Sequence, residues 1–186
     1  MYMPKIQTNK EELIRKSMLV FIKTGYFHTT LSSLAKACNI EKPHFYYYFK
    51  DKKDLMNQVL IYASDQIQNL VFDTAYKEGM EPSARLHTIL DNVLKIHTKN
   101  KYGCLMGNTL LETVGRESYF KPVLCTYFNR WRETLTHLYL TTYEEELAKD
   151  MANEDVAKLQ GGIMLMRLYD DKDVLKKVTD NIKTRL

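Results

Sequence analysis

The chain contains 186 residues, 45% of them hydrophobic, with only 4 Pro and 7 Gly, a composition that favours an all-α protein with short connections. Its formal net charge of +4 is unevenly placed, because residues 1–55 hold 10 Lys/Arg against 5 Asp/Glu and the remainder holds 17 against 18. The basic excess at the N-terminal end suits a polyanionic partner.

A first helix is predicted from about Lys10 to Thr24. Asn9 is expected to cap it, because a side-chain oxygen at that position accepts one of the unpaired N–H groups that open a helix. Gly25 is expected to end it, as glycine commonly does.

A second helix is predicted from about residue 31 to 38, with Thr30 as its N-cap. Asn39 suits the left-handed conformation that ends many helices, and Pro43 suits the first turn of a following helix. The apolar residues of this second helix recur at the spacing of one buried face: Leu31, Leu34, Ala35 and Cys38.

The third helix, predicted from about Pro43 to Phe49, is short and aromatic. Phe45 and Phe49 are four residues apart and are expected to anchor it in the core. Three consecutive tyrosines span most of a helix circumference, so at least one hydroxyl of residues 46–48 must face outward. Two short helices joined by a tight turn follow the helix-turn-helix plan, in which the second helix enters the DNA major groove.

The residues at fixed places in this stretch are Thr30, Leu34-Ala35, Asn39-Ile40, Phe45-Tyr46-Tyr47-Tyr48-Phe49, Lys52 and Leu55. With them the stretch resembles the DNA-binding domain of the TetR family of transcriptional regulators, although Asn39 stands where the family usually has Gly. The resemblance implies an all-α fold of about nine helices, with a three-helix, helix-turn-helix DNA-binding domain in residues 1–52 and a helical effector-binding and dimerisation domain in residues 53–186. It also implies a homodimer, formed through the last two helices, that reads a palindromic double-stranded operator.

Nine residues are assigned to DNA contact. Those expected to read bases are Lys42, Pro43, His44 and Tyr46. Lys42 suits guanine O6 and N7, but it could equally take a phosphate. Those expected to contact phosphate are Thr30, Tyr47, Tyr48 and Lys52, and Ser32 completes the set.

The rest of the chain is predicted to be helical. Asp51 is expected to cap a helix long enough to act as a lever between the two domains. The expected helices run from Lys52 to about Lys77, from Pro82 to about Lys99, from Glu117 or Ser118 to about Lys149, from Asn153 to about Tyr169, and from Asp171 to the C-terminus.

The run from Tyr102 to Glu112 resembles a Gly-Cys-x-x-Gly-Asn-x-x-x-Glu segment near the effector pocket of many TetR-family regulators. Asn108 and Glu112 would share a helical face, where a structural hydrogen-bonded pair is an equal alternative to ligand contact. The expected pocket is aromatic and methionine-rich, which suits flat or adaptable apolar molecules, although the same residues could form a dense core: Tyr62, Ile89, His97, Cys104, Met106, Asn108, Tyr127, Phe128, Trp131 and Met164.

Several classes of protein are not expected. The sequence contains no P-loop, G-x-G-x-x-G, H-E-x-x-H, G-x-S-x-G or paired-Cys zinc motif, so we expect neither an enzyme nor a metal or other cofactor. Three cysteines are an odd number, which indicates reduced thiols in a cytoplasmic protein. No stretch approaches the roughly 20 apolar residues that span a bilayer, so no membrane partner is expected.

The function predicted from these features is that of a homodimeric transcriptional repressor, released from its operator when a small molecule binds the C-terminal domain. Two alternatives stay open. One is a thiol- or electrophile-sensing repressor that acts through Cys104, since an exposed thiolate is the reactive form. The other is a DNA-binding protein without an effector.

Overall fold

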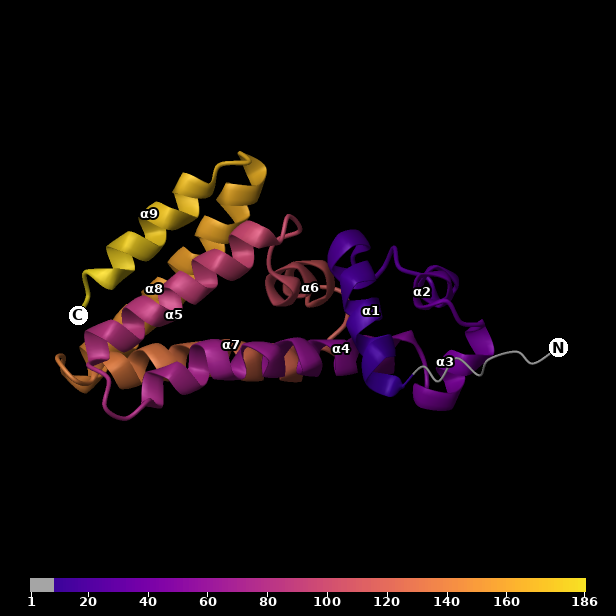
Figure 1. The fold of residues 1–186 in the computed structure, drawn as a ribbon, viewed down its shortest axis with the longest axis horizontal. Helices are drawn as coiled ribbons and strands as arrows, with labels where there is room; N and C mark the ends of the chain where they lie inside the picture. The colour runs from indigo at the N-terminus through magenta and orange to yellow at the C-terminus, as the bar shows by residue number, and fades with distance from the viewer. Residues whose placement is uncertain (1–8) are drawn as a thin grey trace.

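The computed structural model describes residues 9–186, so residues 1–8 of the expected DNA-binding domain lie outside the described part. Within residues 9–186 the chain forms nine α-helices, two short segments of other helical types, and no strand. Figure 1 shows the N-terminal helices at one end of an elongated molecule and the C-terminal helices at the other. The predicted all-α fold is therefore confirmed.

The first three helices are α1 (Lys10–Thr24), α2 (Leu31–Cys38) and α3 (Lys42–Tyr48). Their ends lie where local signals predict them. The Asn9 side chain accepts a first-turn N–H at 2.8 Å, and the Thr30 hydroxyl accepts another at 3.1 Å. Asn39 ends α2 with φ at 55°, in the left-handed region, and Pro43 lies in the first turn of α3.

The helix that leaves the N-terminal unit changes type before its expected end. Its segments are α4 (Lys52–Ile67), the π-helical η1 (Gln68–Phe72) and the 3₁₀-helical η2 (Asp73–Tyr76). Asp51 caps α4, as expected. The Leu70 carbonyl accepts hydrogen bonds from Asn92 Nδ2 at 2.8 Å and from Thr74 Oγ1 at 3.2 Å, so side chains satisfy backbone groups where the helix widens. Such π-helical turns often accompany functional sites.

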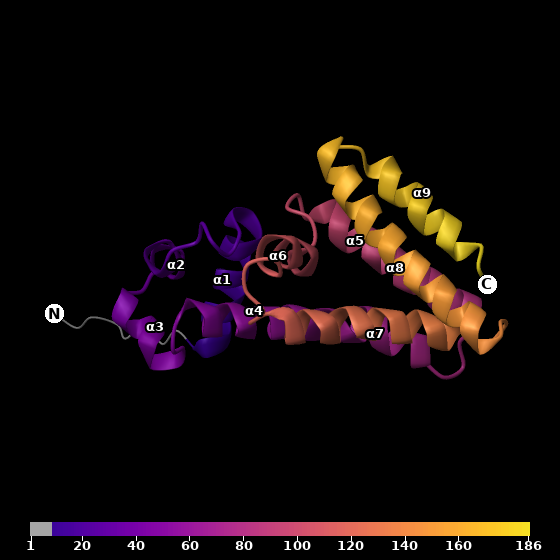
Figure 2. The same cartoon turned by 180° about the vertical axis from the view of Figure 1, so that it is seen from behind.

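The C-terminal helices are α5 (Pro82–Lys99), α6 (Leu105–Thr113), α7 (Lys121–Tyr139), α8 (Glu145–Leu168) and α9 (Lys172–Lys183). α7 packs along α8, and α9 packs on both α8 and α5. In both Figure 1 and Figure 2, α6 lies between α1 and α5, beside the line of α4 and α7. None of the helices in residues 9–186 is long and apolar enough to cross a bilayer.

The long helix expected to end near residue 149 is interrupted. α7 ends at Tyr139 and α8 begins at Glu145, so Asn153, expected to start a helix, lies inside α8. The turn between them is closed by the N–H groups of Thr142 and Tyr143, which donate to the Tyr139 carbonyl at 3.0 and 2.8 Å. Neither Gly nor Pro marks this turn, so the sequence pattern alone predicts one uninterrupted helix through it.

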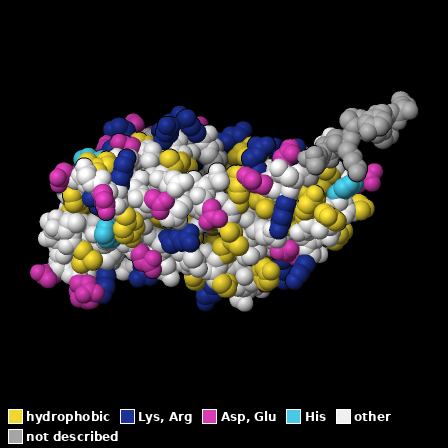
Figure 3. Space-filling model, turned by 60° about the horizontal axis from the view of Figure 1, so that its bottom comes forward, with side chains coloured by type: hydrophobic (Ala, Val, Ile, Leu, Met, Phe, Trp, Pro, Cys, Tyr) yellow, Lys and Arg dark blue, Asp and Glu magenta, His cyan; other side chains and the backbone are white. Residues whose placement is uncertain are grey.

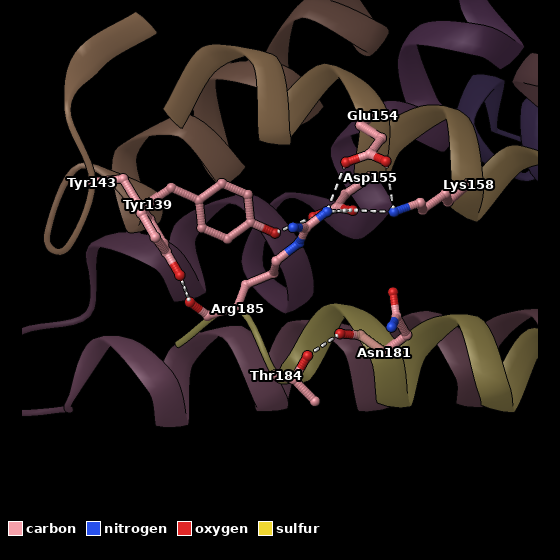
Figure 4. A network of polar contacts seen from close by, with 8 residues as sticks. All are labelled: Tyr139, Tyr143, Glu154, Asp155, Lys158, Asn181, Thr184 and Arg185. Atoms are coloured by element: carbon pink, nitrogen blue, oxygen red, sulfur yellow. Dashed lines mark hydrogen bonds and ion pairs between the residues drawn. The ribbon is translucent and has the colours of Figure 1, made fainter. Parts of the chain in front are cut away.

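A buried carboxylate fastens the end of the chain to α7 and α8. Asp155 is fully buried and accepts the Tyr139 hydroxyl at 2.7 Å. The Arg185 guanidinium donates to both Asp155 oxygens at 3.2 Å and to Glu154 at 2.7 Å, and the Lys158 ammonium lies 3.6 Å from Asp155. Figure 4 shows these groups converging between α8 and the residues that follow α9. A buried charge that has this many partners is satisfied.

Candidate nucleic-acid interface and ligand cavities

Two phenylalanines hold α3, and its tyrosines face outward. Phe45 and Phe49 are 1% and 3% exposed, with ring centroids 6.1 Å apart. Tyr46 and Tyr47 are 59% and 83% exposed, which confirms that tyrosine hydroxyls of this helix reach solvent. Tyr48 is half-buried and packs edge-on against Tyr47, with centroids 4.8 Å apart.

Five further residues assigned to DNA are exposed on the same helix-turn-helix. Lys42, Pro43 and His44 lie at the start of α3, and Thr30 and Ser32 lie at the start of α2. Figure 3 shows Lys and Arg side chains interspersed with hydrophobic ones at this end of the molecule. Basic, aromatic and hydroxyl groups on two adjoining helix starts can reach both base edges and phosphates.

The ammonium group of Lys52, which is predicted to contact phosphate, points inward. It donates to the carbonyls of Tyr26 and Thr29, both at 2.8 Å, and lies 4.3 Å from the centre of the Tyr26 ring. Burial lowers the pKa of this ammonium from its ordinary value, against the opposing pull of Glu112 and Glu117. Lys52 therefore braces the loop between α1 and α2 in this structure, and its contact with phosphate stays a prediction.

The same loop is held from the other side by Glu112 on α6. The Glu112 carboxylate accepts the backbone N–H of Tyr26 at 2.8 Å and that of Phe27 at 2.7 Å. Gly25 allows this approach, because its φ is +77° and a Cβ there would lie 2.9 Å from the carboxylate. We call Glu112 and the two N–H groups the α6 latch. It joins a C-terminal helix directly to the residues that lead into the helix-turn-helix.

An outer groove of about 340 Å³ lies between α6 and α8. Of the predicted pocket residues, Cys104, Asn108, Phe128 and Met164 line it. Asn108 does not pair with Glu112, since its Nδ2 donates to the Tyr102 carbonyl at 2.8 Å. The full lining is Tyr102, Gly103, Cys104, Gly107, Asn108, Leu110, Leu111, Phe128, Gln160, Gly161, Ile163, Met164 and Arg167.

A second space of about 200 Å³, open to solvent to about the same degree as the outer groove, lies among α1, α4, η1, α5, α6 and α7, and we call it the inner cavity. The predicted residues His97, Cys104, Met106, Tyr127 and Trp131 line it. Its lining contains no Asp, Glu, Lys or Arg: Met18, Ile22, Ala63, Gln66, Ile67, Val71, Val93, Ile96, His97, Asn100, Gly103, Cys104, Leu105, Met106, Tyr127 and Trp131.

Two predicted pocket residues line neither space. Ile89 is fully buried in the core, and Tyr62 is half-buried and packs against it. Ile89 therefore packs in the core and Tyr62 against it, and neither lines the outer groove or the inner cavity. α5 directs Ile89 and His97 to different neighbours because they are eight residues apart, which rotates their directions by about 80° at 3.6 residues per turn.

Cys104 is a buried helix cap. It is 6% exposed, and its Sγ accepts the Gly107 N–H at 3.4 Å at the start of α6. Burial raises the pKa of this thiol from its ordinary value, which lowers the thiolate fraction that reacts with electrophiles. In residues 9–186 no group of three or more His, Cys, Asp or Glu side chains could hold a metal ion.

Comparison with known protein families gives a separate match for each half of the chain. Residues 13–59 match the model of bacterial regulatory proteins of the tetR family. Residues 82–181, more than half of the chain, match the C-terminal domain of LmrA/YxaF-like transcriptional regulators. The chain belongs to the TetR family. This family consists of helix-turn-helix transcription regulators, so the chain is a DNA-binding regulator and not an enzyme.

Relatives of the TetR-family chain agree with this assignment over nearly its whole length. An uncharacterised HTH-type transcriptional regulator in the lacX 3′ region of Lactococcus lactis is 25% identical over 96% of this chain and 93% of its own. The HTH-type transcriptional repressor DhaR of Mycobacterium sp. GP1 is 24% identical over 89% and 86%. A TetR regulator structure from Legionella pneumophila, 22% identical, superposes over 98% of this chain and 99% of its own with a TM-score of 0.88.

For two residues of this TetR-family chain that matter to the site, no local signal indicates the partners. The family-like segment and the spacing from Asn108 point to Glu112 but not to its partners, which are more than 80 residues away in the chain. Arg167 lines the outer groove and donates to the carbonyls of His97 and Asn100 at the end of α5. A basic residue in the last turn of α8 suggests only capping of its own helix, so sequence alone did not place it.

Proposed function

We propose that the protein is a homodimeric repressor that binds a palindromic operator through α3 and is released when a small molecule binds its C-terminal region. The observation that carries the proposal is the division of α3 between two buried phenylalanines and an exposed basic and aromatic face. A buried anchor fixes the helix orientation, so the exposed face can be presented to a major groove. The name of DhaR as a repressor supports the sign of regulation.

The DNA-reading role is tested by replacing Lys42, which is exposed at the first position of α3. Lys42→Ala should weaken operator binding more than binding to scrambled DNA, because a base contact contributes about 1–3 kcal/mol of discrimination. Lys95→Ala is the matched control, since it removes the same charge from an exposed site on α5. An equal loss on both DNAs would reassign Lys42 to the phosphate backbone.

The dimer is expected to use the outer face of α8. A run of small and apolar residues is open to solvent there, including Met164 at 57% and Leu168 at 70% exposure, beside Ala157 and Gly161. The outward residues of α9 are mostly charged, and its apolar residues are turned inward, as where Val178 lies against Gly162. We therefore place α8 at the centre of the interface expected on the last two helices.

The effect of ligand binding would be transmitted to the DNA-binding helices by α6. This helix lines both the outer groove and the inner cavity, and it carries the α6 latch on the loop before α2. A molecule that binds better to a displaced α6 would shift the population toward a different placement of the helix-turn-helix. The lever expected in α4 is braced against the same loop by Lys52, so both routes converge on residues 25–29.

The two alternative functions receive less support. A thiol sensor needs an accessible thiolate, whereas Cys104 is buried with a raised pKa. A regulator without an effector would not need the inner cavity, which borders the helix that carries the α6 latch. We therefore retain the ligand-responsive repressor as the proposal.

A further inference from the structure

The inner cavity contains polar atoms without partners. His97 Nδ1 and Trp131 Nε1 are both buried and form no hydrogen bond, and both side chains line the cavity. Trp131 lies near enough to the Tyr127 phenol to oppose the rise in its pKa that burial causes, yet it does not reach hydrogen-bond geometry with it. A buried polar group without a partner costs about 1–3 kcal/mol, so a molecule that pairs with these atoms would recover that cost.

The identity of the atoms restricts the partner. An indole N–H can only donate, so Trp131 requires an acceptor. A neutral imidazole nitrogen either donates or accepts, depending on the tautomer. His97 is neutral at physiological pH, because burial and the nearby Arg167 guanidinium lower its pKa to about 4. A hydroxyl group, which accepts and donates at once, can satisfy both side chains.

The charge of the cavity lining and the volume of the cavity restrict the ligand further. The cavity lining contains no charged side chain, so an ionised ligand would lose part of its hydration without gaining an opposite charge. A cation would also be repelled by Arg167, whose guanidinium binds the His97 carbonyl. The volume of about 200 Å³ is below the ~300–1,000 Å³ of pockets for drug-sized ligands, which favours a molecule of one or two rings.

We propose that the inner cavity binds an uncharged one- or two-ring molecule whose hydroxyl or carbonyl oxygen accepts a hydrogen bond from Trp131 Nε1, and whose hydroxyl also pairs with His97 Nδ1. This deepens the proposed function, since it assigns the chemical class of the effector. A trapped water is the competing partner, because a void of about 10 Å³ is bordered by both side chains and is near the lower limit for one water.

The test uses probes that share one ring system: tetralin, 1-tetralone, 1-tetralol, protonated 1-aminotetralin and the anion of tetralin-1-carboxylic acid. Affinities are measured by calorimetry on the full-length protein. Trp131 is the only tryptophan, so the ¹H–¹⁵N spectrum contains a single indole cross-peak that reports on this N–H without further assignment. DNA release by each probe is measured separately by fluorescence anisotropy.

We expect 1-tetralol to bind at least tenfold more tightly than tetralin, the two charged probes to bind more weakly than tetralin, and the indole proton to move downfield with tetralol and tetralone only. In Trp131→Phe, which keeps a ring but loses the N–H, tetralol affinity should fall about tenfold while tetralin affinity is kept. The wild-type spectrum decides the matter if this variant does not fold.

Equal affinities for tetralol and tetralin would overturn the inference in favour of a trapped water. Tighter binding of a charged probe, an unmoved indole peak with bound tetralol, or no binding of any probe at millimolar concentration would also overturn it. Binding of tetralol without DNA release would leave the inference standing and contradict only the effector response in the proposed function.

Discussion

The α6 latch gives the sharpest expectation, because one substitution removes its charge and half of its acceptor capacity. In Glu112→Gln an amide replaces a carboxylate that accepts two backbone N–H groups, at 2.8 Å from Tyr26 and 2.7 Å from Phe27. The amide oxygen can keep one of these bonds, while the NH₂ group faces the other N–H. One donor is therefore left unpaired, and the remaining bond loses its charge assistance.

The expected loss in the free energy of unfolding follows from the two hydrogen bonds. Hydrogen bonds to charged groups contribute about 1.5–3 kcal/mol each, and neutral ones contribute about 0.5–1.5 kcal/mol. Because the Glu112 side chain is only half-buried, we take the lower end and expect the free energy of unfolding to fall by about 2 kcal/mol. If the free energy of local opening falls by the same amount, hydrogen exchange at the Tyr26 and Phe27 amides should speed up by about 30-fold.

Glu117→Gln is the matched control. It removes the same charge from the segment after α6, where Glu117 pairs with Lys53 at 3.2 Å and does not bond the loop. The Lys53 side chain is 45% exposed and the Glu117 side chain 22%, so we expect this partly buried pair to contribute about 1 kcal/mol. Stability is read from urea unfolding, and the two amides from exchange mass spectrometry or NMR. If Glu112→Gln and Glu117→Gln had equal effects on both readouts, the α6 latch would not couple the two parts of the molecule.

Three further expectations concern stability and assembly. Asp155→Asn should lower the free energy of unfolding by about 2–3 kcal/mol in urea titrations, because it leaves the partly exposed Arg185 guanidinium facing an uncharged buried group. The pKa of His97 is lowered to about 4 from 6.5, so the unfolded chain binds more protons than the folded one between these pH values. The free energy of unfolding should therefore rise with pH and differ by about 2 kcal/mol between pH 5 and pH 7.5. His97→Gln should lack this pH-dependent contribution. Leu168→Glu should dissociate the proposed dimer in analytical ultracentrifugation, whereas Leu19→Glu, at a 57% exposed site on α1, should not. A stable Leu168→Glu dimer would place the interface elsewhere.

The DNA-binding end could be predicted closely because its signals are local. The caps at Asn9 and Thr30, the left-handed Asn39 and the buried pair Phe45 and Phe49 are each determined by a few neighbouring residues. Capping and periodicity act within one or two helical turns. Sequence therefore predicted both the elements and their exposed face.

Features that depend on distant contacts could not be predicted in this way. Lys52 looks like a surface cation at a helix start, and only the fold brings it to the carbonyls of residues 26 and 29. Glu112 likewise meets its partners across the two halves of the chain. The turn after Tyr139 contains no Gly or Pro and is held by packing and by Tyr143, whose hydroxyl donates to the Arg185 carbonyl at 2.7 Å. Tertiary contacts override local propensity at such places.

The central claim is sequence-selective DNA binding by a dimer, and one titration tests it most directly. The purified protein is titrated by fluorescence anisotropy into DNA from its own upstream intergenic region and into a scrambled version, over a series of salt concentrations. We predict tighter binding to the upstream DNA, two subunits per site, and a selectivity that persists as salt weakens both complexes. Weak binding that is equal on both DNAs and lost with salt would contradict the claim, and the base-reading roles of α3 would be withdrawn with it.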